Sequence, residues 1–331
     1  MDALSDALRS LRISGSMFID ADLKAPWAVV TPSSRDIACA LGNEHDHVIP
    51  YHLVTEGECL VTVEGAATPL AAGDMALFPQ GHVHVLGSHE NVAPLPLRKE
   101  FVEAVLARRS VLPIRHGGDG RTVKLLCGFF TLERWGAEHL TMGLPALITA
   151  RIGTRGGQEL LAAVARGSID AKLAGGPGSD ALVCKLSEIL FIEALRQFVS
   201  QGFVPARGWL AGLRDPAIGH ALALLHSLPQ QDWDIQSLAA TCAFSRSKFA
   251  AAFTRLVGSS PMKYLAQWRM ILAARDLSDG GVSVKQLAER YRYGSEAAFA
   301  KAFRKIFGTP PAAFRRGQHG SSKSSENQEI H

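Results

Sequence analysis

The chain has 331 residues, 47% of them hydrophobic and 20% charged, with a formal net charge of +4 at pH 7. This length suits two globular domains, each with its own core. Five scattered cysteines with no CxxC pair indicate neither a zinc ribbon nor a disulfide framework. The most apolar stretch, around 181–200, holds four charged residues and is no membrane span, and acids near the N-terminus argue against a signal peptide, so we expect a cytoplasmic protein.

The charge is divided unevenly along the chain. Residues 212–317 hold 15 Lys or Arg and 7 Asp or Glu, whereas residues 1–211 hold 19 and 22. A basic C-terminal third behind a slightly acidic remainder favours a polyanionic partner for the C-terminal part. A solvated helical surface would give the same balance, so charge alone does not decide between these interpretations.

The first part of the chain, about 15–131, has the pattern of short strands. Apolar runs such as WAVVT, HVIPYHLVT, CLVTV, MALFP and VHVL alternate with the turn sequences EGE, EGAATP, AAGD and PQGH. This pattern predicts an all-β barrel or sandwich. Residues 88–121 read as a long irregular segment, after which TVKLLCGFFTL at 122–132 resumes the strand pattern.

Histidines cluster in the same part of the chain. Six of the twelve lie between 45 and 89, namely His45, His47, His52, His82, His84 and His89. The stretch GDMALFPQGHVH at 73–84 places two tight turns, Gly73-Asp74 and Pro79-Gln80-Gly81, around one inward-facing strand. It resembles the second motif of the cupin family, G-x5-P-x-G-x2-H, and the resemblance implies a double-stranded β-helix barrel.

These histidines allow three interpretations. A metal could be held by His45 or His47 with His52 and His84, but the first cupin motif is incomplete because Pro50 stands where its Glu belongs. The histidines could instead be hydrogen-bonded core residues. We favour the third interpretation, in which His52 and His84 line a small-molecule pocket without a metal or another cofactor.

After residue 132 the pattern becomes helical. Residues 180–202, DALVCKLSEILFIEALRQFVSQG, carry a broad apolar stripe at helical spacing that ends at Gly202. The stripe serves the core of the domain or a second copy of the chain, so this helix is our candidate dimer interface. We expect residues 1–202 to form one domain, 203–213 a linker, 214–317 a second domain and 318–331 a disordered tail.

One piece of the chain occurs twice. Residues 245–261 read SRSKFAAAFTRLVGSSP and residues 295–311 read SEAAFAKAFRKIFGTPP, with seven of seventeen positions identical. In each copy a Ser suits the N-cap, two phenylalanines four residues apart share one face, a Gly suits a left-handed C-terminal residue and a Pro suits the next helix start. With a shorter helix upstream, each copy predicts a helix-turn-helix unit.

A single helix is predicted between the two copies. PMKYLAQWRMILAARDLSDGG at 261–281 gives a helix of about 19 residues, roughly 28 Å long at 1.5 Å per residue. One turn of B-DNA rises about 34 Å, so this helix could hold two recognition helices near successive major grooves. An all-α repeat that reads nothing is the alternative, but the duplication and the charge balance favour double-stranded DNA as partner.

Residues 214–316 as a whole resemble the DNA-binding domain of the AraC/XylS family of bacterial transcription regulators. The resemblance rests on S-x3-F-x3-F-x4-G-x2-P in the first copy and on VKQLAERYRYGSEAAF at 284–299, where Arg292-Tyr293 replaces the family's usual Gly-Tyr. It implies an α+β chain of two domains: a cupin-like sensor barrel with following helices, and an all-α domain of two helix-turn-helix units joined by a linker helix.

The same resemblance, carried over position by position, assigns candidate DNA contacts. The base-reading positions are Ser247, Ala250 and Ala251 in the first unit, and Glu296, Ala297, Ala300 and Lys301 in the second. Because alanine offers only a methyl group, we expect the first unit to bind mainly phosphates, through Arg246, Lys248, Thr254 and Arg255. Glu296 and Lys301 carry the direct reading of bases.

The sequence therefore predicts a transcription regulator rather than an enzyme. Its barrel would sense a small molecule, and it would bind DNA as a homodimer, with RNA polymerase as a candidate further partner and no membrane contact. One alternative is a cupin metalloenzyme fused to a DNA-binding unit, which would need a complete ligand set. The other is a redox-sensing regulator that uses Cys59 and Cys127, although a buried strand cysteine is more often inert.

Overall fold

The structure, a computed structural model, describes residues 13–41, 46–97, 111–133, 137, 141–152, 167, 176–202 and 207–316. The chain divides into two compact units, one of which comprises Leu11–Pro205 while the other contains Ala206 and the residues that follow. Within the described ranges, no helix has both the length and the apolar character that a membrane crossing requires. His45 and the predicted tail 318–331 lie outside the described residues.

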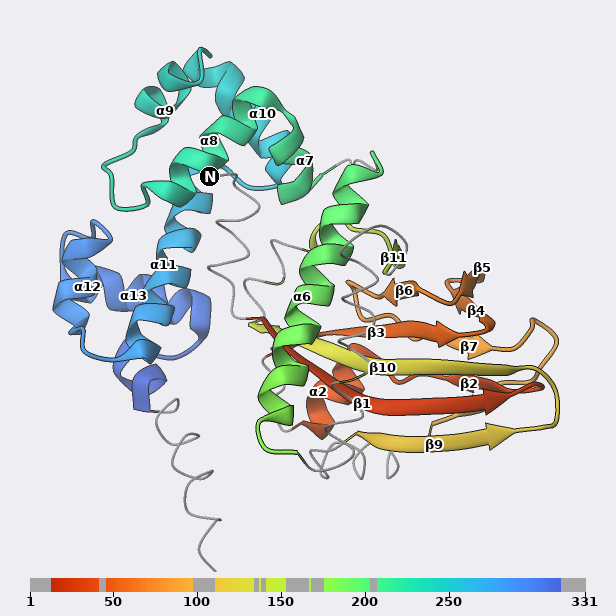
Figure 1. The fold of residues 1–331 in the computed structure, drawn as a ribbon. Coiled ribbons are helices and arrows are strands. Elements are labelled where there is room, and N and C mark those ends of the chain that lie inside the picture. The colour runs from red at the N-terminus through yellow and green to blue at the C-terminus, as the bar shows by residue number, and fades with distance from the viewer. Residues whose placement is uncertain are drawn as a thin grey trace, which may run out of the picture. The chain divides into compact units, whose positions relative to one another are not determined.

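The first unit contains two sheets (Figure 1). The six-stranded sheet has the order β11-β6-β3-β10-β1-β9, and the five-stranded sheet has the order β5-β4-β7-β2-β8. The strands are β1 (Ile13–Lys24), β2 (Ala28–Val30), β3 (Asp46–Glu56), β4 (Glu58–Val63), β5 (Ala66–Ala71), β6 (Asp74–Leu77), β7 (Val85–Gly87), β8 (Leu95–Pro96), β9 (Leu112–Gly117), β10 (Thr122–Glu133) and β11 (Ile148–Arg151).

One apolar core lies between the two sheets. In β4 every second side chain, from Cys59 to Val63, is buried, as expected of a strand with one face in a core. The six-stranded sheet contributes buried residues of β1, β3, β6 and β10 to the same core, namely Ala21, Leu23, Val54, Ala76, Val123 and Leu125. This arrangement confirms the predicted barrel, including the buried strand β6 between its two turns.

Four elements of the first unit differ from the prediction. β8 and β9 lie within 88–121, which we expected to be irregular, and they pair in parallel with β2 and β1. β11 lies in a stretch that we expected to be helical, and it pairs with β6. The helix α2 (Ser34–Ala40), held by a capping box between Ser33 and Asp36, was not predicted. All four are too short to set a period of their own in the sequence.

The helix α6 (Ser179–Ser200) covers the outer face of the six-stranded sheet, where it crosses β1 and β10 (Figure 1). Phe191 packs on Phe130 of β10, with ring centroids 4.9 Å apart, and Ser187 Oγ lies 3.4 Å from the Tyr51 hydroxyl. The predicted helix over 180–202 is confirmed, and its buried stripe serves the core of this unit.

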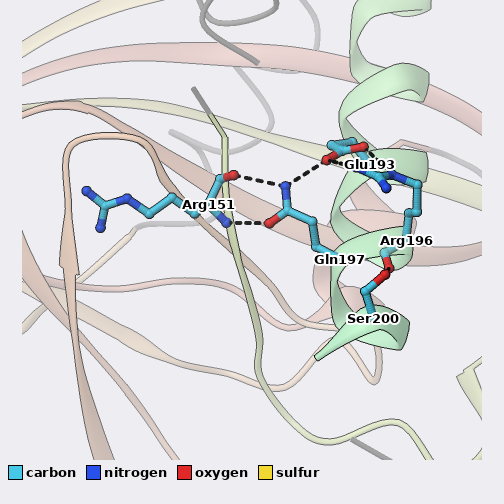
Figure 2. Close-up of polar contacts among 5 residues, drawn as sticks. All are labelled: Arg151, Glu193, Arg196, Gln197 and Ser200. Carbon is cyan, nitrogen blue, oxygen red and sulfur yellow. Dashed lines mark hydrogen bonds and ion pairs between the residues drawn. The ribbon is translucent and has the colours of Figure 1, made fainter. Parts of the chain in front are cut away.

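A side-chain amide also ties α6 to the edge strand β11, as Figure 2 shows. The Arg151 N–H donates to Gln197 Oε1, and Gln197 Nε2 donates to the Arg151 carbonyl, both at 2.9 Å. Gln197 Nε2 also donates to Glu193, which forms an ion pair with Arg196. Because β11 is the last strand of its sheet, this amide occupies the side on which a further strand would pair.

The second unit is helical. Its helices are α7 (Trp209–Arg214), α8 (Pro216–Ser227), α9 (Ile235–Thr241), α10 (Arg246–Val257), α11 (Pro261–Asp279), α12 (Val284–Arg290) and α13 (Glu296–Phe307). The nineteen-residue helix α11 runs from the group of α8, α9 and α10 to the group of α12 and α13 (Figure 1). The two predicted helix-turn-helix units and the linker helix between them are confirmed.

Residues 209–213, which we expected to belong to a linker, are part of α7, and residues 203–206 lie outside the described residues. Trp209, Leu210 and Ala211 are buried there, so these apolar residues supply core packing to the second unit. The Gly208 N–H donates to the Leu256 carbonyl in the last turn of α10, at 2.8 Å. α7 is therefore part of the first helix-turn-helix unit.

Candidate functional site

The turns of the two helix-turn-helix units have the same geometry. A non-glycine residue with a left-handed φ follows the first helix of each unit, Ala243 at 56° and Arg292 at 63°. The N–H of the next residue then donates to a carbonyl of the first helix, at 2.9 Å in one unit and 2.8 Å in the other. The turn, rather than the identity of its residues, is what the repeat preserves.

The second helices, α10 and α13, also begin and end alike. Ser245 and Ser295 are their N-cap residues, and Ser295 Oγ accepts from the Ala298 N–H. Both helices end at a left-handed glycine, Gly258 and Gly308. These positions agree with the spacing of Ser and Gly in the sequence.

α10 presents the predicted contact residues to solvent. Phe249, Phe253 and Val257 are buried on one face. The exposed residues are Arg246, Ser247, Lys248, Ala251, Thr254 and Arg255, and Ala250 is half-buried. A helix that buries one stripe leaves the opposite face free to enter a groove of DNA.

α13 repeats this arrangement with a different set of polar groups. Phe299 and Phe303 are buried, whereas Glu296, Ala297 and Lys301 are exposed and Ala300 is half-buried. Two further exposed cations, Arg304 and Lys305, were missing from the predicted contacts. They occupy the positions of Thr254 and Arg255 in the first copy, so the repeat itself carries the signal that finds them.

Most of these cations are not committed to carboxylates. Among the described residues, none of Arg255, Lys301, Arg304 and Lys305 takes part in an ion pair. Lys248 Nζ lies 5.0 Å from the centre of the Phe244 ring, within range of a cation–π contact. Unpaired surface cations can bind phosphates without first giving up a protein partner.

In the barrel, one row of side chains crosses the inner face of the six-stranded sheet. The register places Ile19 beside Cys127, Cys127 beside His52, and His52 beside Ala76. Directly opposite residues on neighbouring strands lie on the same face of a sheet. Ile19 and Cys127 are partly exposed, whereas His52 and Ala76 are buried.

His84 meets His52 from the opposite side of the barrel. The two Nε2 atoms are 2.7 Å apart, and the His84 ring stacks on Phe78 with centroids 3.4 Å apart. His84 Nδ1 lies 2.9 Å from the His82 carbonyl, which can only accept, so Nδ1–H donates there. His84 Nε2 then accepts from His52 Nε2–H, and His52 Nδ1 is left as a buried acceptor without a partner among the described residues.

Burial lowers the pKa of both rings. For His52 burial is the larger cause and the nearby His84 the smaller one. Burial lowers the pKa of His84 to about 4, and the hydrogen bond to the His82 carbonyl opposes this shift. Both imidazoles are therefore neutral near pH 7, which agrees with the single proton shared between their Nε2 atoms.

The other candidate metal ligands do not join this pair. His47 Nε2 lies 2.6 Å from the Pro79 carbonyl, and His45 falls outside the described residues. In the part of the chain that the structure describes, no three His, Cys, Asp or Glu side chains come together as a metal site would need.

The two barrel cysteines have raised pKa values. Burial raises the pKa of Cys59 to about 12, and burial raises that of Cys127 as well, although part of its surface reaches solvent. Both side chains remain thiols at pH 7, whereas the thiolate is the reactive form.

Comparison with known proteins agrees with both units. A family model described as Cupin matches residues 2–200, and a model described as Helix-turn-helix domain matches residues 238–317. A putative AraC-like transcription regulator of Streptomyces lividans is 31% identical over 319 residues, which cover 96% of this chain and 98% of the relative. The chain belongs to the AraC family of transcription regulators.

Other members of the AraC family match along the same length. The HTH-type transcriptional regulator AlkR of Acinetobacter baylyi is 27% identical over 340 residues, covering 96% of this chain and 99% of the relative. Among solved structures, the DNA-binding domain of AdpA in complex with a target DNA matches at 33% identity, with a TM-score of 0.30, over 32% of this chain and 96% of that chain. This AraC-family chain is a DNA-binding transcription regulator, and its relatives carry the names of regulators.

Proposed function

We propose that this regulator reads two successive major grooves of double-stranded DNA, one with α10 and one with α13. The observation that carries the proposal is the pair of matching recognition helices, each with an exposed polar face, at the two ends of one helix. With nineteen residues, α11 spans roughly 28 Å, which is close to the 34 Å or so of one DNA turn.

The two helices divide the work in this proposal. α13 carries Glu296 and Lys301, a possible acceptor for cytosine N4 and a donor for guanine, so it reads bases. In α10, Ala251 stands at the position of Lys301 and Arg246 at that of Glu296, so α10 binds phosphates through Arg246, Lys248 and Arg255. The exposed Arg304 and Lys305 give α13 a share of the phosphate binding as well.

Selection of duplexes from a random pool by the purified full chain tests the reading of two grooves. Hydroxyl-radical footprinting of a selected duplex should reveal two protected segments about one helical turn, or roughly 10 base pairs, apart. The segment bound by α13 should have the stronger sequence preference. A single protected segment, or enrichment of no sequence, would contradict the proposal.

We further propose that the barrel binds a small-molecule effector next to His52 and His84. The support is the row across the inner face of the six-stranded sheet, in which the partly exposed Ile19 and Cys127 lead to the buried His52. An effector bound there would shift the balance between two states of the regulator. A compound that raises the melting temperature of the unaltered protein should not raise that of His52→Leu, whereas exposed His89→Gln should respond normally.

The homodimer that we expect on DNA would form through α6. Leu182, Ile189 and Ile192 are 45%, 48% and 42% exposed, and their spacing puts them on the face opposite the buried stripe. Sedimentation of the full chain should change from dimer to monomer in an Ile189→Glu, Ile192→Glu variant. A glutamate placed instead at the exposed Lys285 of α12, outside α6, should leave the dimer intact. RNA polymerase, in the bacterial cytoplasm, would be the further partner of such a dimer.

The two alternatives have less support. An enzymatic barrel would need bound metal, so stoichiometric iron or manganese in the purified protein would revive that alternative. A redox sensor would need a reactive thiolate, but the pKa values of Cys59 and Cys127 are raised by burial. Loss of an oxidant response on changing both cysteines to Ser would favour the sensor.

A further inference from the structure

The loop between α8 and α9 is held by two arginines from outside its own helix-turn-helix unit. Arg269 of α11 donates from Nε to the Pro229 carbonyl at 2.7 Å and from Nη2 to the Gln231 carbonyl at 2.8 Å. Arg292 donates from Nε to the Gln230 carbonyl at 3.0 Å. Three successive carbonyls of this loop therefore accept from guanidinium groups.

The two arginines come from different places. Arg269 is part of α11, the helix that already connects the two helix-turn-helix units. Arg292 is the left-handed residue in the turn of the second unit, three residues before the N-cap of α13. The hydrogen bond from Arg292 to Gln230 therefore joins the second helix-turn-helix unit directly to the first, without passing through α11.

Two features of Arg292 work against its position unless this contact compensates for them. Its φ of 63° is in the left-handed region, which a side chain disfavours and which Gly would adopt freely. It also brings a second positive charge close to Arg269. Burial is the main cause that lowers the pKa of Arg269; Tyr293 and Asp232 oppose this shift, and the charge of Arg292 adds to it. Backbone carbonyls, which only accept hydrogen bonds, are well suited to hold two such donors side by side.

We propose that Arg292 is a positioning residue: a strut that sets the distance between the recognition helices α10 and α13. Without it, α11 alone would fix that distance, so any change in the curvature of this helix would change it. With it, the turn before α13 is bonded to the loop before α9. The distance between α10 and α13 is then set in the free protein, before DNA is bound. The inference rests on the proposed reading of two grooves, because only then does the distance between the helices matter.

A preset distance has a measurable consequence for DNA. A protein whose two recognition helices are held at a fixed distance loses less conformational entropy when it binds a site of matching spacing. It fits a site of different spacing poorly. Removal of the strut should therefore reduce the difference between matching and mismatched sites. Binding to either half of the site alone should not change.

The test uses the full chain and a duplex that it selects from a random pool. Affinity is measured for that duplex and for derivatives that gain or lose one base pair between the two protected segments. In Arg292→Gly the preference for the original spacing should fall about threefold, as loss of one exposed hydrogen bond allows. Because Gly relieves the left-handed backbone as the bond is lost, this variant should fold.

Two further variants separate the strut from simple charge. Arg290→Ala also removes an exposed guanidinium, one that binds Asp276 of α11 at 2.8 Å, and it should leave the spacing preference unchanged. Arg292→Lys keeps the charge and a donor, and it should restore part of the preference. An unchanged preference in Arg292→Gly, or an equal loss in Arg290→Ala, would overturn the proposal.

A second measurement needs no DNA. In the loop, the Gln231 N–H donates to the Leu228 carbonyl and the Trp233 N–H donates to the Gln231 carbonyl. These two amides should exchange hydrogen faster in Arg292→Gly and at the normal rate in Arg290→Ala. Unchanged exchange in Arg292→Gly would refute the strut. A chain that selects no duplex would refute the two-groove reading, while the exchange rates still decide whether the strut exists.

Discussion

The exposed side chains of α10 and α13 differ in what they can recognise. In the proposed reading, Lys301 faces bases together with Glu296, whereas Arg255 lies in the last turn of a helix whose base-facing positions are Ser247, Ala250 and Ala251. Lys301→Ala should weaken binding to the preferred DNA sequence by about 1–3 kcal/mol and relax the preference at one base position. Arg255→Ala should weaken binding to all sequences alike and lower the salt slope by about one.

Affinities for duplexes with single base changes, measured at several salt concentrations, distinguish these two outcomes. The exposed Lys285 of α12, outside both recognition helices, offers a control in Lys285→Ala. Equal and sequence-independent losses from Lys301→Ala and Arg255→Ala would contradict the division between base reading and phosphate binding.

The buried imidazoles make the barrel sensitive to acid. A histidine whose pKa is lower in the folded chain binds its proton more readily when unfolded, so falling pH favours unfolding. With the pKa of His84 near 4 and an ordinary value of 6.5, stability should decline as pH falls from 6.5 toward 4. The steepest loss is about 1.4 kcal/mol per pH unit for one such histidine.

Urea denaturation between about pH 7 and pH 5 measures this slope. His84→Gln should flatten it, whatever the change in absolute stability, and exposed His89→Gln should leave it as it is. An identical slope in His84→Gln and the unaltered protein would mean that the His52–His84 pair does not link stability to pH.

At the level of helices, α7 depends on a close approach to α10. A Cβ added at Gly212 would lie 2.8 Å from Val257 Cγ2 and 3.0 Å from Leu222 Cδ1, both on buried side chains. Gly212→Ala gains helix propensity of up to about 1 kcal/mol, but overpacking a filled core costs about 1–3 kcal/mol. We expect the helical unit, α7 to α13, to lose about 1 kcal/mol of unfolding free energy and to bind DNA more weakly.

Thermal unfolding and DNA affinity of Gly212→Ala test this expectation. The matched control is Gly294→Ala, because a Cβ at Gly294 meets nothing within 4 Å. A Gly212→Ala variant that is more stable than the unaltered protein would show that α7 moves away from α10 without loss.

The elements that could be predicted from sequence are those with enough residues to set a period. The Phe249 and Phe253 spacing defines α10, and the long stripe of 180–202 defines α6. β9 and β11 form because a neighbouring strand pairs with them, and their own few residues carry no clear alternation. α7 could not be predicted for a similar reason. With only six residues it is too short to show a helical period, so its Trp and Leu residues could equally belong to a linker.

At the scale of the whole molecule, the uneven charge should govern affinity for DNA. Residues 212–317 carry 15 Lys or Arg against 7 Asp or Glu. If the two helix-turn-helix units together neutralise about six phosphates, affinity for any duplex should fall roughly a thousandfold between about 50 and 200 mM salt. Arg304→Ala should make this dependence less steep, and binding that ignores salt would contradict an electrostatic interface.

The fold of the whole chain followed from a repeat and two motifs, whereas the details of both candidate sites did not. His52 and His84 could be named from sequence, but the register that sets Cys127 beside His52 depends on strands far apart in the chain. Arg292 looked like a small departure in a turn, because its acceptor, Gln230, precedes it by some sixty residues. Contacts of this kind have no local signal.

The amide of Gln197 has a consequence for how copies of the chain behave in a crowded solution. An uncovered edge strand is a template on which strands of other molecules can add, and β11 would offer its Arg151 N–H and carbonyl for that purpose. Gln197 holds both groups. We expect Gln197→Leu to form aggregates during heating, detected by light scattering, well before Ser200→Ala does, because the Ser200 hydroxyl donates to the Arg196 carbonyl within α6 and not to β11 in the described part of the chain. Clear solutions of both variants up to the melting temperature would show that the edge is protected by other means.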